Sequence, residues 1–439
     1  TIAVVYAILS GFWGVVITDI VQFFIAMFGS IALAIIALNH VGGMDTLLQK
    51  LSSLLGTDII HENTLKFIPP IPDNSIGSLS FWESPFSKFL IFITVMWWSH
   101  HGTDGGGYII QRMSSAKNEK HALLATLWFN LAHYAVRVWP WIIVGVVSII
   151  MFPVIPDSYS ELGTKAGYPL VMNMLLGPGM KGILIVSFLA AFMSTIDTHL
   201  NWGASYIIND IYKRFFKPNE SEKHYVIVSK IITVVLMILA AFTALKMQSI
   251  SKAWAFIFSM GAGIGLVLIL RWFWWRINAW SEITALSTSI VITLLLECLA
   301  WWQVSAKEGA YSLFGTEPIL FGIQIQVHHK LIIIVPIAIL SWLIATFITK
   351  PEPTEHLRKF YEKVQPGGWW GPITTNFNHS LQPVSKGILV QWVAGVMMIY
   401  GFTFGIGNLI FMQYGNSILL LGCAFIGTFV IWNRSISKL

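Results

Sequence analysis

A run of polar residues and glycines interrupts one of the apolar stretches of this 439-residue chain. Between Trp98 and Tyr108 the sequence reads SHHGTDGGG, which offers hydroxyl, imidazole and carboxylate groups to a small polar ligand. Its four glycines each cost about 0.8–1 kcal/mol relative to alanine in a helix interior, so the run predicts a broken helix. The spacing leaves a second interpretation open, in which the glycines only end a helix.

A second segment combines small residues, hydroxyls and a carboxylate within one apolar stretch. Ala191, Ser194, Thr195 and Thr198 are spaced i, i+3, i+4 and i+7, so they share one face of a helix. Hydroxyl and carbonyl oxygens suit a hard monovalent cation. Asp197 would cost about 2.5–3.5 kcal/mol at the centre of a membrane helix, so we expect it to face protein, water or a cation. Close helix packing through the small residues is the alternative.

Asp19 and a polar stripe are further candidates. Asp19 lies about one turn inside an apolar stretch, where its position alone does not distinguish a functional carboxylate from a helix cap. Asn130, His133 and Arg137 are spaced i, i+3 and i+7, which predicts a stripe that faces a cavity or neighbouring helices. Arg137 could pair with an anionic substrate or with an internal acid such as Asp104.

Several histidines invite a metal-site interpretation. His100, His101, Asp104, His121 and His133 are residue types that bind transition metals, which makes a membrane metalloenzyme one rival hypothesis. Metal sites in helical bundles usually repeat i, i+3 or i, i+4 ligand pairs across helices, and the sequence lacks that repetition. We therefore expect no organic cofactor and no metal other than a coupling ion.

The elements that position these residues are expected to be membrane helices. Hydrophobic residues make up 55% of the chain, charged residues only 11%, and the mean hydropathy is +0.69, which argues against a soluble domain. The excess of 27 Lys and Arg over 21 Asp and Glu is not gathered into a basic stripe, so nucleic acid is not an expected partner. The expected partner is the lipid bilayer.

Apolar runs between polar breaks predict about ten full spans after a partial first one. The full spans lie near 14–40, 84–112, 121–152, 180–212, 224–247, 251–275, 280–303, 328–349, 387–411 and 415–434. Lys and Arg collect in alternate connections, which predicts a multi-pass cell-membrane protein with a cytoplasmic C-terminus and cytoplasmic loops at 112–120, 213–223 and 350–386. We expect one transmembrane domain over 1–439, with 350–386 as a loop within it.

Three segments together resemble motifs of the sodium:solute symporter family. Gly11–Gln22 resembles its helix AVxxTDxxQ, Tyr108–Lys117 its loop YIIQRxxxAK, and Lys181–Lys213 its run KGxxxxxxxAAxxSSxxSxxN followed by DIYK. The resemblance extends from the first residue to at least Trp275. It implies an all-α, leucine-transporter-like membrane bundle with inverted repeats and a discontinuous helix at 84–112. Relatives have about four helices before the point that matches Thr1, so we expect an N-terminally truncated chain.

The same resemblance implies a cation site. The carbonyl of Ala191 and the hydroxyls of Ser194 and Thr195 fall on sodium-site positions of the family, and Thr195 replaces the commoner serine. Asp19 falls on a carboxylate associated with a second cation position. With Asp197, these residues form the predicted sodium site.

The substrate positions match the family less well. The predicted substrate residues are Ser99, His101, Gly102, Thr103, Asp104, Asn130 and Trp254. Sugar-transporting relatives have an asparagine and a gating aromatic residue where this chain has Ser99 and Gly102, a lysine at the position of Asn130 and a glutamine at that of Trp254. These departures argue against a simple hexose as the substrate.

The expected function is sodium-coupled symport of a small organic solute, such as a sugar or a sugar acid, by alternating access, and not an enzymatic activity. Two alternatives stay open. One is a solute sensor built on a transporter scaffold, which the linker-like segment after Lys350 suggests. The other is the His-rich membrane metalloenzyme.

Overall fold

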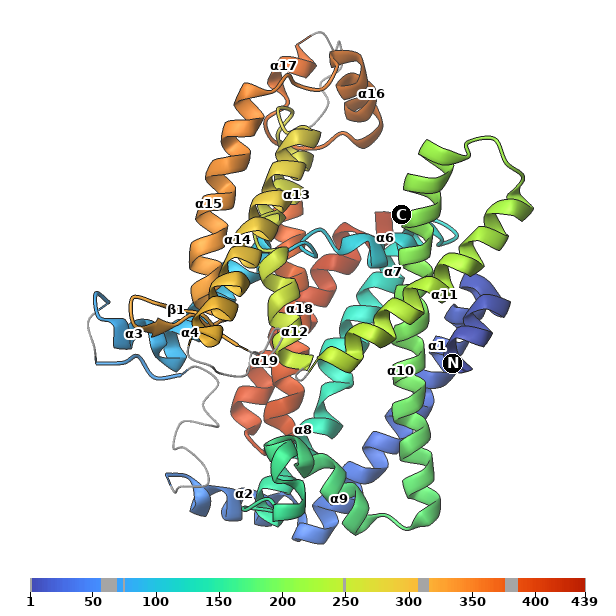
Figure 1. The fold of residues 1–439 in the computed structure, drawn as a ribbon. Coiled ribbons are helices and arrows are strands. Elements are labelled where there is room, and N and C mark those ends of the chain that lie inside the picture. The colour runs from blue at the N-terminus through green and yellow to red at the C-terminus, as the bar shows by residue number, and fades with distance from the viewer. Residues whose placement is uncertain are drawn as a thin grey trace. The chain divides into compact units, whose positions relative to one another are not determined.

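The computed structural model describes residues 2–56, 69–73, 76–247, 250–306, 316–375 and 386–438, and it is almost entirely helical (Figure 1). The chain divides into two compact units. Unit 1 contains Thr1–Thr64, Lys117–Leu245 and Val393–Leu439, and unit 2 contains Leu65–Ala116 and Lys246–Trp392. Each unit therefore combines segments that are far apart in the sequence.

Unit 1 is built from long helices. They are α1 (Ile2–Val41), α2 (Gly43–Leu54), α7 (Glu119–Asn130), η2 (Leu131–Val136), α8 (Val138–Met151), η3 (Asp157–Ala166), α9 (Gly167–Leu175), α10 (Pro178–Tyr206), η4 (Ile207–Phe216), α11 (Glu222–Lys246), most of α18 (Lys386–Ile410), α19 (Tyr414–Arg434) and η5 (Ile436–Lys438). Pro178 is the first residue of α10. A backbone N–H at this position has no acceptor within the helix, so a proline here costs no hydrogen bond.

The core of unit 1 lies where α1 meets α8, α9 and α10. Leu33, Val144, Val171 and Leu184 are fully or almost fully buried there. At Gly29 of α1, an added Cβ would lie 3.0 Å from Leu184 Cδ1, so the absent side chain lets α1 and α10 pack closely along each other.

Unit 2 has shorter helices and one small sheet. Its elements are α3 (Leu79–Glu83), α4 (Pro85–Ile91), η1 (Phe92–Met96), α5 (Trp97–Ser99), α6 (Gly106–Ser114), α12 (Ile250–Met260), α13 (Gly265–Phe273), α14 (Ala279–Ser305), β1 (Ile319–Leu320), β2 (Ile323–Gln324), α15 (Val327–Ile348), α16 (Thr354–Val364) and α17 (Gly371–Thr374). The strands form an antiparallel pair, with Ile319 opposite Gln324 and Leu320 opposite Ile323. Helices α14 and α15 lie side by side (Figure 1).

Two helix interruptions contact each other inside unit 2. The predicted break separates α5 from α6 at residues 100–105, and a second break of four residues separates α12 from α13, which are bent by 42°. A Cβ added to Gly265, the first residue of α13, would collide with the carbonyl oxygen of Trp98 and with the backbone of Ser99. The glycine therefore allows one broken helix to lie directly against the other.

The close approach of loop 368–370 to the end of α13 depends on another glycine. The N–H of Trp369 donates to Phe273 O at 2.5 Å, and the N–H of Trp275 donates to Trp369 O at 3.3 Å. Gly368 has φ +96°, and a Cβ there would collide with Phe273 O. This part of the loop is thus hydrogen-bonded to the helix end.

Among the described residues, eight helices are long and apolar enough to cross a membrane, and the bent pair α12–α13 could be a ninth span. The remaining expected span, near 84–112, is not one continuous helix. It consists of α4, η1, α5 and α6, and the predicted break lies between α5 and α6. The partial first span was expected to be separate from the next one, but α1 runs through Gly11 without interruption. A glycine without a neighbouring proline is tolerated inside a helix, which explains the difference.

Replacing Gly265 with alanine is expected to destabilise the protein by about 1–3 kcal/mol, because the new methyl group overpacks against backbone that cannot move away. Gly145→Ala in α8 is the matched control. An added Cβ meets no atom within 4 Å there, so this change should be neutral or stabilise by up to about 1 kcal/mol. Thermal unfolding of both purified variants tests the packing, and equal melting temperatures would contradict it.

Candidate functional site

The predicted cation site brings α1 and α10 together in unit 1. Asp19 of α1 accepts a short hydrogen bond from the hydroxyl of Ser194 on α10. Thr195, the next residue on α10, donates through Oγ1 to Ala191 O one turn back along the helix, at 2.9 Å. The contact between Asp19 and Ser194 joins two residues 175 positions apart in the sequence. It places a carboxylate beside a hydroxyl, which are oxygen ligands of the kind that hard cations prefer.

Asp197 lies one turn beyond Ser194 and is completely buried. Neither of its carboxylate oxygens has a hydrogen-bond partner among the described residues. Gln22 Oε1, one turn beyond Asp19 on α1, is likewise buried without a partner. A buried carboxylate charge with no partner costs several kcal/mol. The carboxyl group must therefore be protonated or be compensated by a cation.

The broken helix of unit 2 forms a compact turn held by its own polar groups. Thr103 Oγ1 donates to His100 O at 2.6 Å, and the N–H of Gly102 donates to His100 Nδ1 at 2.9 Å. The N–H of Gly105 donates to Gly102 O at 3.0 Å. Gly105 has φ +92° and Gly106 φ +64°, which are left-handed conformations that favour glycine. The glycines therefore make the turn possible and do not simply end a helix.

Aromatic contacts connect the turn with Trp254. The ring centroids of His100 and Phe258 are 5.9 Å apart, and those of Phe258 and Trp254 are 5.5 Å apart. His101 packs against Gly261 at the second break, where a Cβ would collide with its imidazole ring. Ser99 is buried, and its hydroxyl has no partner in the described part of the chain. Predicted substrate residues from two distant segments thus lie around the same pair of helix breaks.

Asp104 takes part in an ion pair that the sequence analysis missed. Its Oδ2 accepts from Arg271 Nη2 at 2.8 Å, while its Oδ1 accepts from the N–H of Gly106 at 3.0 Å. Arg271 also donates to Glu282 Oε1 at 3.2 Å. Arg271 thereby links the turn to α13 and α14. The signal was available in the sequence, because an arginine in the last turn of an apolar helix requires a partner.

The polar stripe of α7 and η2 lies in unit 1, so Asn130 is in a different unit from the other six predicted substrate residues. Asn130 Nδ2 donates to Thr126 O at 2.9 Å. Arg137 approaches His133 Nε2 at 3.4 Å and stacks over the Trp141 ring. The proposed partner of Arg137, Asp104, is instead bound by Arg271.

The metal-site hypothesis was based on five scattered residues. Across the described ranges, no group of three or more His, Cys, Asp and Glu side chains is arranged to hold a metal ion.

Comparison with known proteins gives a family match. The model of the sodium:solute symporter family matches residues 1–292. The osmoregulated proline transporter OpuE of Bacillus subtilis (strain 168) is 24% identical over 305 residues, which cover 67% of this chain and 55% of the relative. Sodium/glucose cotransporter 4 of Danio rerio is 24% identical over 395 residues, which cover 84% of this chain and 56% of the relative. The chain thus spans about half the length of these relatives.

A solved structure supports the fold. The substrate-bound outward-open state of a Na⁺-coupled sialic acid symporter superposes with a TM-score of 0.52 at 16% identity, over 80% of this chain and 65% of that chain. The expected fold class, an all-α membrane helical bundle of the leucine-transporter type with a discontinuous helix, is confirmed.

The Asp104–Arg271 pair is expected to be energetically coupled, because Asp104 is only 12% exposed and removing one partner leaves the other charge uncompensated. A double-mutant cycle with Asp104→Asn and Arg271→Gln should give a coupling of about 1–2 kcal/mol in thermal or chemical unfolding.

The pair Glu355–Lys359 provides the control for this cycle. It also joins an acid to a base, with 2.8 Å between Lys359 Nζ and Glu355 Oε1, but the side chain of Glu355 is 80% exposed and that of Lys359 is 72% exposed. Its coupling should stay below about 0.5 kcal/mol. Equal couplings for the two pairs would show that the Asp104–Arg271 contact does not hold the turn.

Proposed function

The chain belongs to the sodium:solute symporter family, and we propose from this that it is part of a symporter that uses Na⁺ to carry a small organic solute across a membrane. The observation that carries the proposal is the Asp19–Ser194 contact, which joins two of the family-like motifs at one point of unit 1. The relatives OpuE and sodium/glucose cotransporter 4 are transporters by name. Transport, and not an enzymatic reaction, is therefore the activity to test.

The proposed cation site consists of oxygen atoms from α1 and α10. Asp19 provides charge, Ser194 and Thr195 provide hydroxyls, and Ala191 provides a carbonyl. Asp197 provides a second carboxylate one turn away. A Na⁺ ion bound between the two acids would compensate a buried charge that the described residues leave without a partner.

The proposed solute site lies around the helix breaks of unit 2. Ser99, His101, Gly102 and Thr103 provide polar groups beside Trp254, whose indole ring can stack on a flat or cyclic solute. Asp104 would act indirectly, because its charge is bound by Arg271 and it positions the turn. Asn130 belongs to unit 1 and is not part of this cluster, so its role in solute binding stays a prediction. The named substrates of the relatives, proline, glucose and sialic acid, suggest a small polar solute such as a sugar, a sugar acid or a related compound.

Coupling would require Na⁺ and solute to stabilise the same conformation, so that each raises the affinity for the other. Each Na⁺ that enters supplies about 2.3 kcal/mol per 100 mV of membrane potential and about 1.4 kcal/mol per tenfold concentration gradient. One ion can thus support accumulation of the solute by a factor of ten or more.

The proposed topology places the C-terminus and the connections 112–120, 213–223 and 350–386 in the cytoplasm of a cell-membrane protein. The basic residues of these segments support this orientation through the positive-inside rule.

The experiment that tests the function is uptake into proteoliposomes that contain the full-length protein. A labelled panel of sugars, uronic and sialic acids and amino acids is offered with and without an inward Na⁺ gradient. We expect Na⁺-dependent accumulation of one class of solute. Ligand binding without accumulation under any gradient would replace the transporter proposal with the sensor hypothesis.

The double variant Ser194→Ala with Thr195→Ala should raise the Na⁺ concentration for half-maximal uptake about tenfold or more. Removal of ligands to a charged group costs about 1.5–3 kcal/mol. Thr243→Ala is the control, because Thr243 is an exposed threonine of α11 whose hydroxyl bonds only one turn back along its own helix. Unchanged Na⁺ dependence in the double variant would refute the sodium assignment.

The variant Asp197→Asn tests whether the buried carboxyl group binds Na⁺ or carries a proton during transport. If the carboxylate binds Na⁺, the variant should need about tenfold more Na⁺ for half-maximal uptake at every pH. If the group instead carries a proton in the cycle, Na⁺ dependence stays normal and the pH dependence of uptake disappears. The second result would remove Asp197 from the sodium site.

A further inference from the structure

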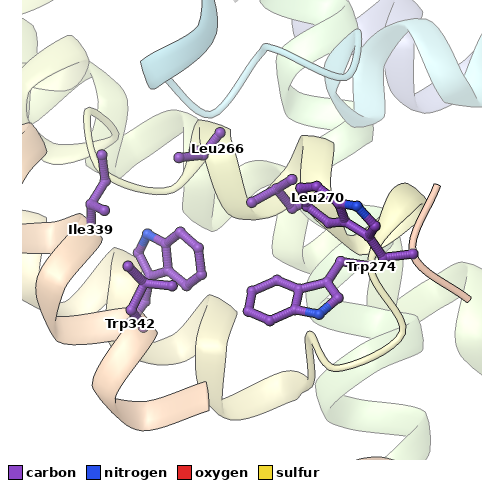
Figure 2. Close-up of a pocket in the computed structure, with 7 residues that line it drawn as sticks. Leu266, Leu270, Trp274, Ile339 and Trp342 are labelled. Atoms are coloured by element: carbon purple, nitrogen blue, oxygen red, sulfur yellow. The ribbon is translucent and has the colours of Figure 1, made fainter. Parts of the chain in front are cut away.

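A cavity of about 470 Å³ lies between α13 and α15 in unit 2. Every residue that lines it is apolar or aromatic: Leu266, Leu270 and Trp274 on one side, and Ile339, Trp342 and Leu343 on the other. Trp369 completes the lining from the loop bonded to the end of α13. Figure 2 shows labelled side chains from both sides pointing into the same space. Its volume is in the usual range for a bound small molecule. The only polar side-chain groups of its lining are the indole N–H groups of its three tryptophans, of which that of Trp342 is buried without a partner among the described residues, so the lining offers few contacts to a sugar or an amino acid.

The cavity lies in membrane-spanning segments, close to their ends. Helix α15 is one of the candidate spans, and Leu343 lies less than two turns before its last residue, Ile348. Trp274 follows directly after the end of α13. The nearby Trp369 is 65% exposed, as expected for an indole at a membrane interface. An apolar molecule of the bilayer is therefore the kind of ligand that fits this position.

Two cations lie just beyond the cavity. Arg276 donates through Nη2 to Thr349 O at 2.6 Å, at the end of α15, and Lys350 is the next residue along the chain. The Trp274 ring from the cavity wall contacts the Phe347 ring at 5.8 Å, and Phe347 O accepts from Arg276 at 3.4 Å. Within the described residues, neither cation forms an ion pair, although Arg271 nearby has two acidic partners.

We propose that this cavity binds one acyl chain of an anionic phospholipid, with the lipid phosphate held by Arg276 and Lys350. The apolar lining matches the chain, and the unpaired positive charge matches the headgroup. Basic residues at the ends of membrane helices recognise anionic lipids in this way. The bound lipid would contact α13, one of the two broken helices that enclose the proposed solute site, but binding itself does not depend on the transport proposal.

Native mass spectrometry of the purified full-length protein tests the proposal. The protein is offered dipalmitoyl phosphatidylglycerol or dipalmitoyl phosphatidylcholine, which have the same chains and different headgroup charge. We expect phosphatidylglycerol to be retained more strongly, by roughly fivefold for each cation involved. Arg276→Gln should reduce that preference by about fivefold, whereas Arg214→Gln, a matched change in unit 1, should leave it unchanged.

The acyl-chain contact is tested separately. Leu343→Trp fills the cavity and should abolish retention of the lipid, and a thermal unfolding curve checks that the variant is folded. As a second test on the native protein, dihexanoyl phosphatidylglycerol should bind at least about tenfold more weakly than the dipalmitoyl lipid, because its chains bury less apolar area. The proposal is overturned if headgroup charge makes no difference, if folded Leu343→Trp retains the lipid, or if chain length does not matter. None of these measurements involves solute uptake.

Discussion

The bilayer offers no hydrogen bonds to a broken helix, and the architecture of unit 2 follows from that constraint. Each interruption leaves backbone N–H and C=O groups without helical partners, and unsatisfied groups cost several kcal/mol in an apolar medium. The turn after α5 satisfies part of this need with its own side chains, through His100, Thr103 and Asp104. The rest depends on burial against a second interruption, which Gly265 makes sterically possible.

The same reasoning explains two sets of paired charges on the helices of unit 2. Glu297 of α14 and Lys330 of α15 are both nearly buried and lie 3.0 Å apart. Arg271 compensates Asp104 and Glu282 together. Such pairs add little net stability, since desolvation opposes the attraction, but loss of one partner is severe. They therefore specify which helices pack together. Asp197 in unit 1 differs from these acids, because neither oxygen of its buried carboxyl group has a hydrogen-bond partner among the described residues.

Much of this structure could be predicted from the sequence, because hydropathy and glycine placement report directly on membrane helices. The helices near 121–152, 224–247, 280–303 and 328–349 were expected where they are found. The break at 100–105 was expected from its glycines. The grouping of Asp19 with Ser194 and Thr195 came from the family resemblance and not from spacing, and in the structure Asp19 contacts Ser194. The bend between α12 and α13 and the pairing of Asp104 with Arg271 were not expected. Both depend on which helices become neighbours, and a single sequence carries no record of such long-range contacts.

The apolar side chains of α10 have a consequence for how the chain enters the membrane. Ile183, Ile185, Val186, Phe188, Leu189 and Phe192 are all substantially exposed on this helix. On the insertion scale, each contributes about −0.3 to −0.6 kcal/mol, whereas an acid at the helix centre opposes insertion by about 2.5–3.5 kcal/mol. Together these side chains offset most of the penalty of Asp197 during biogenesis. The apolar residues of α10 thus allow the helix to carry an acid into the bilayer before any cation is bound.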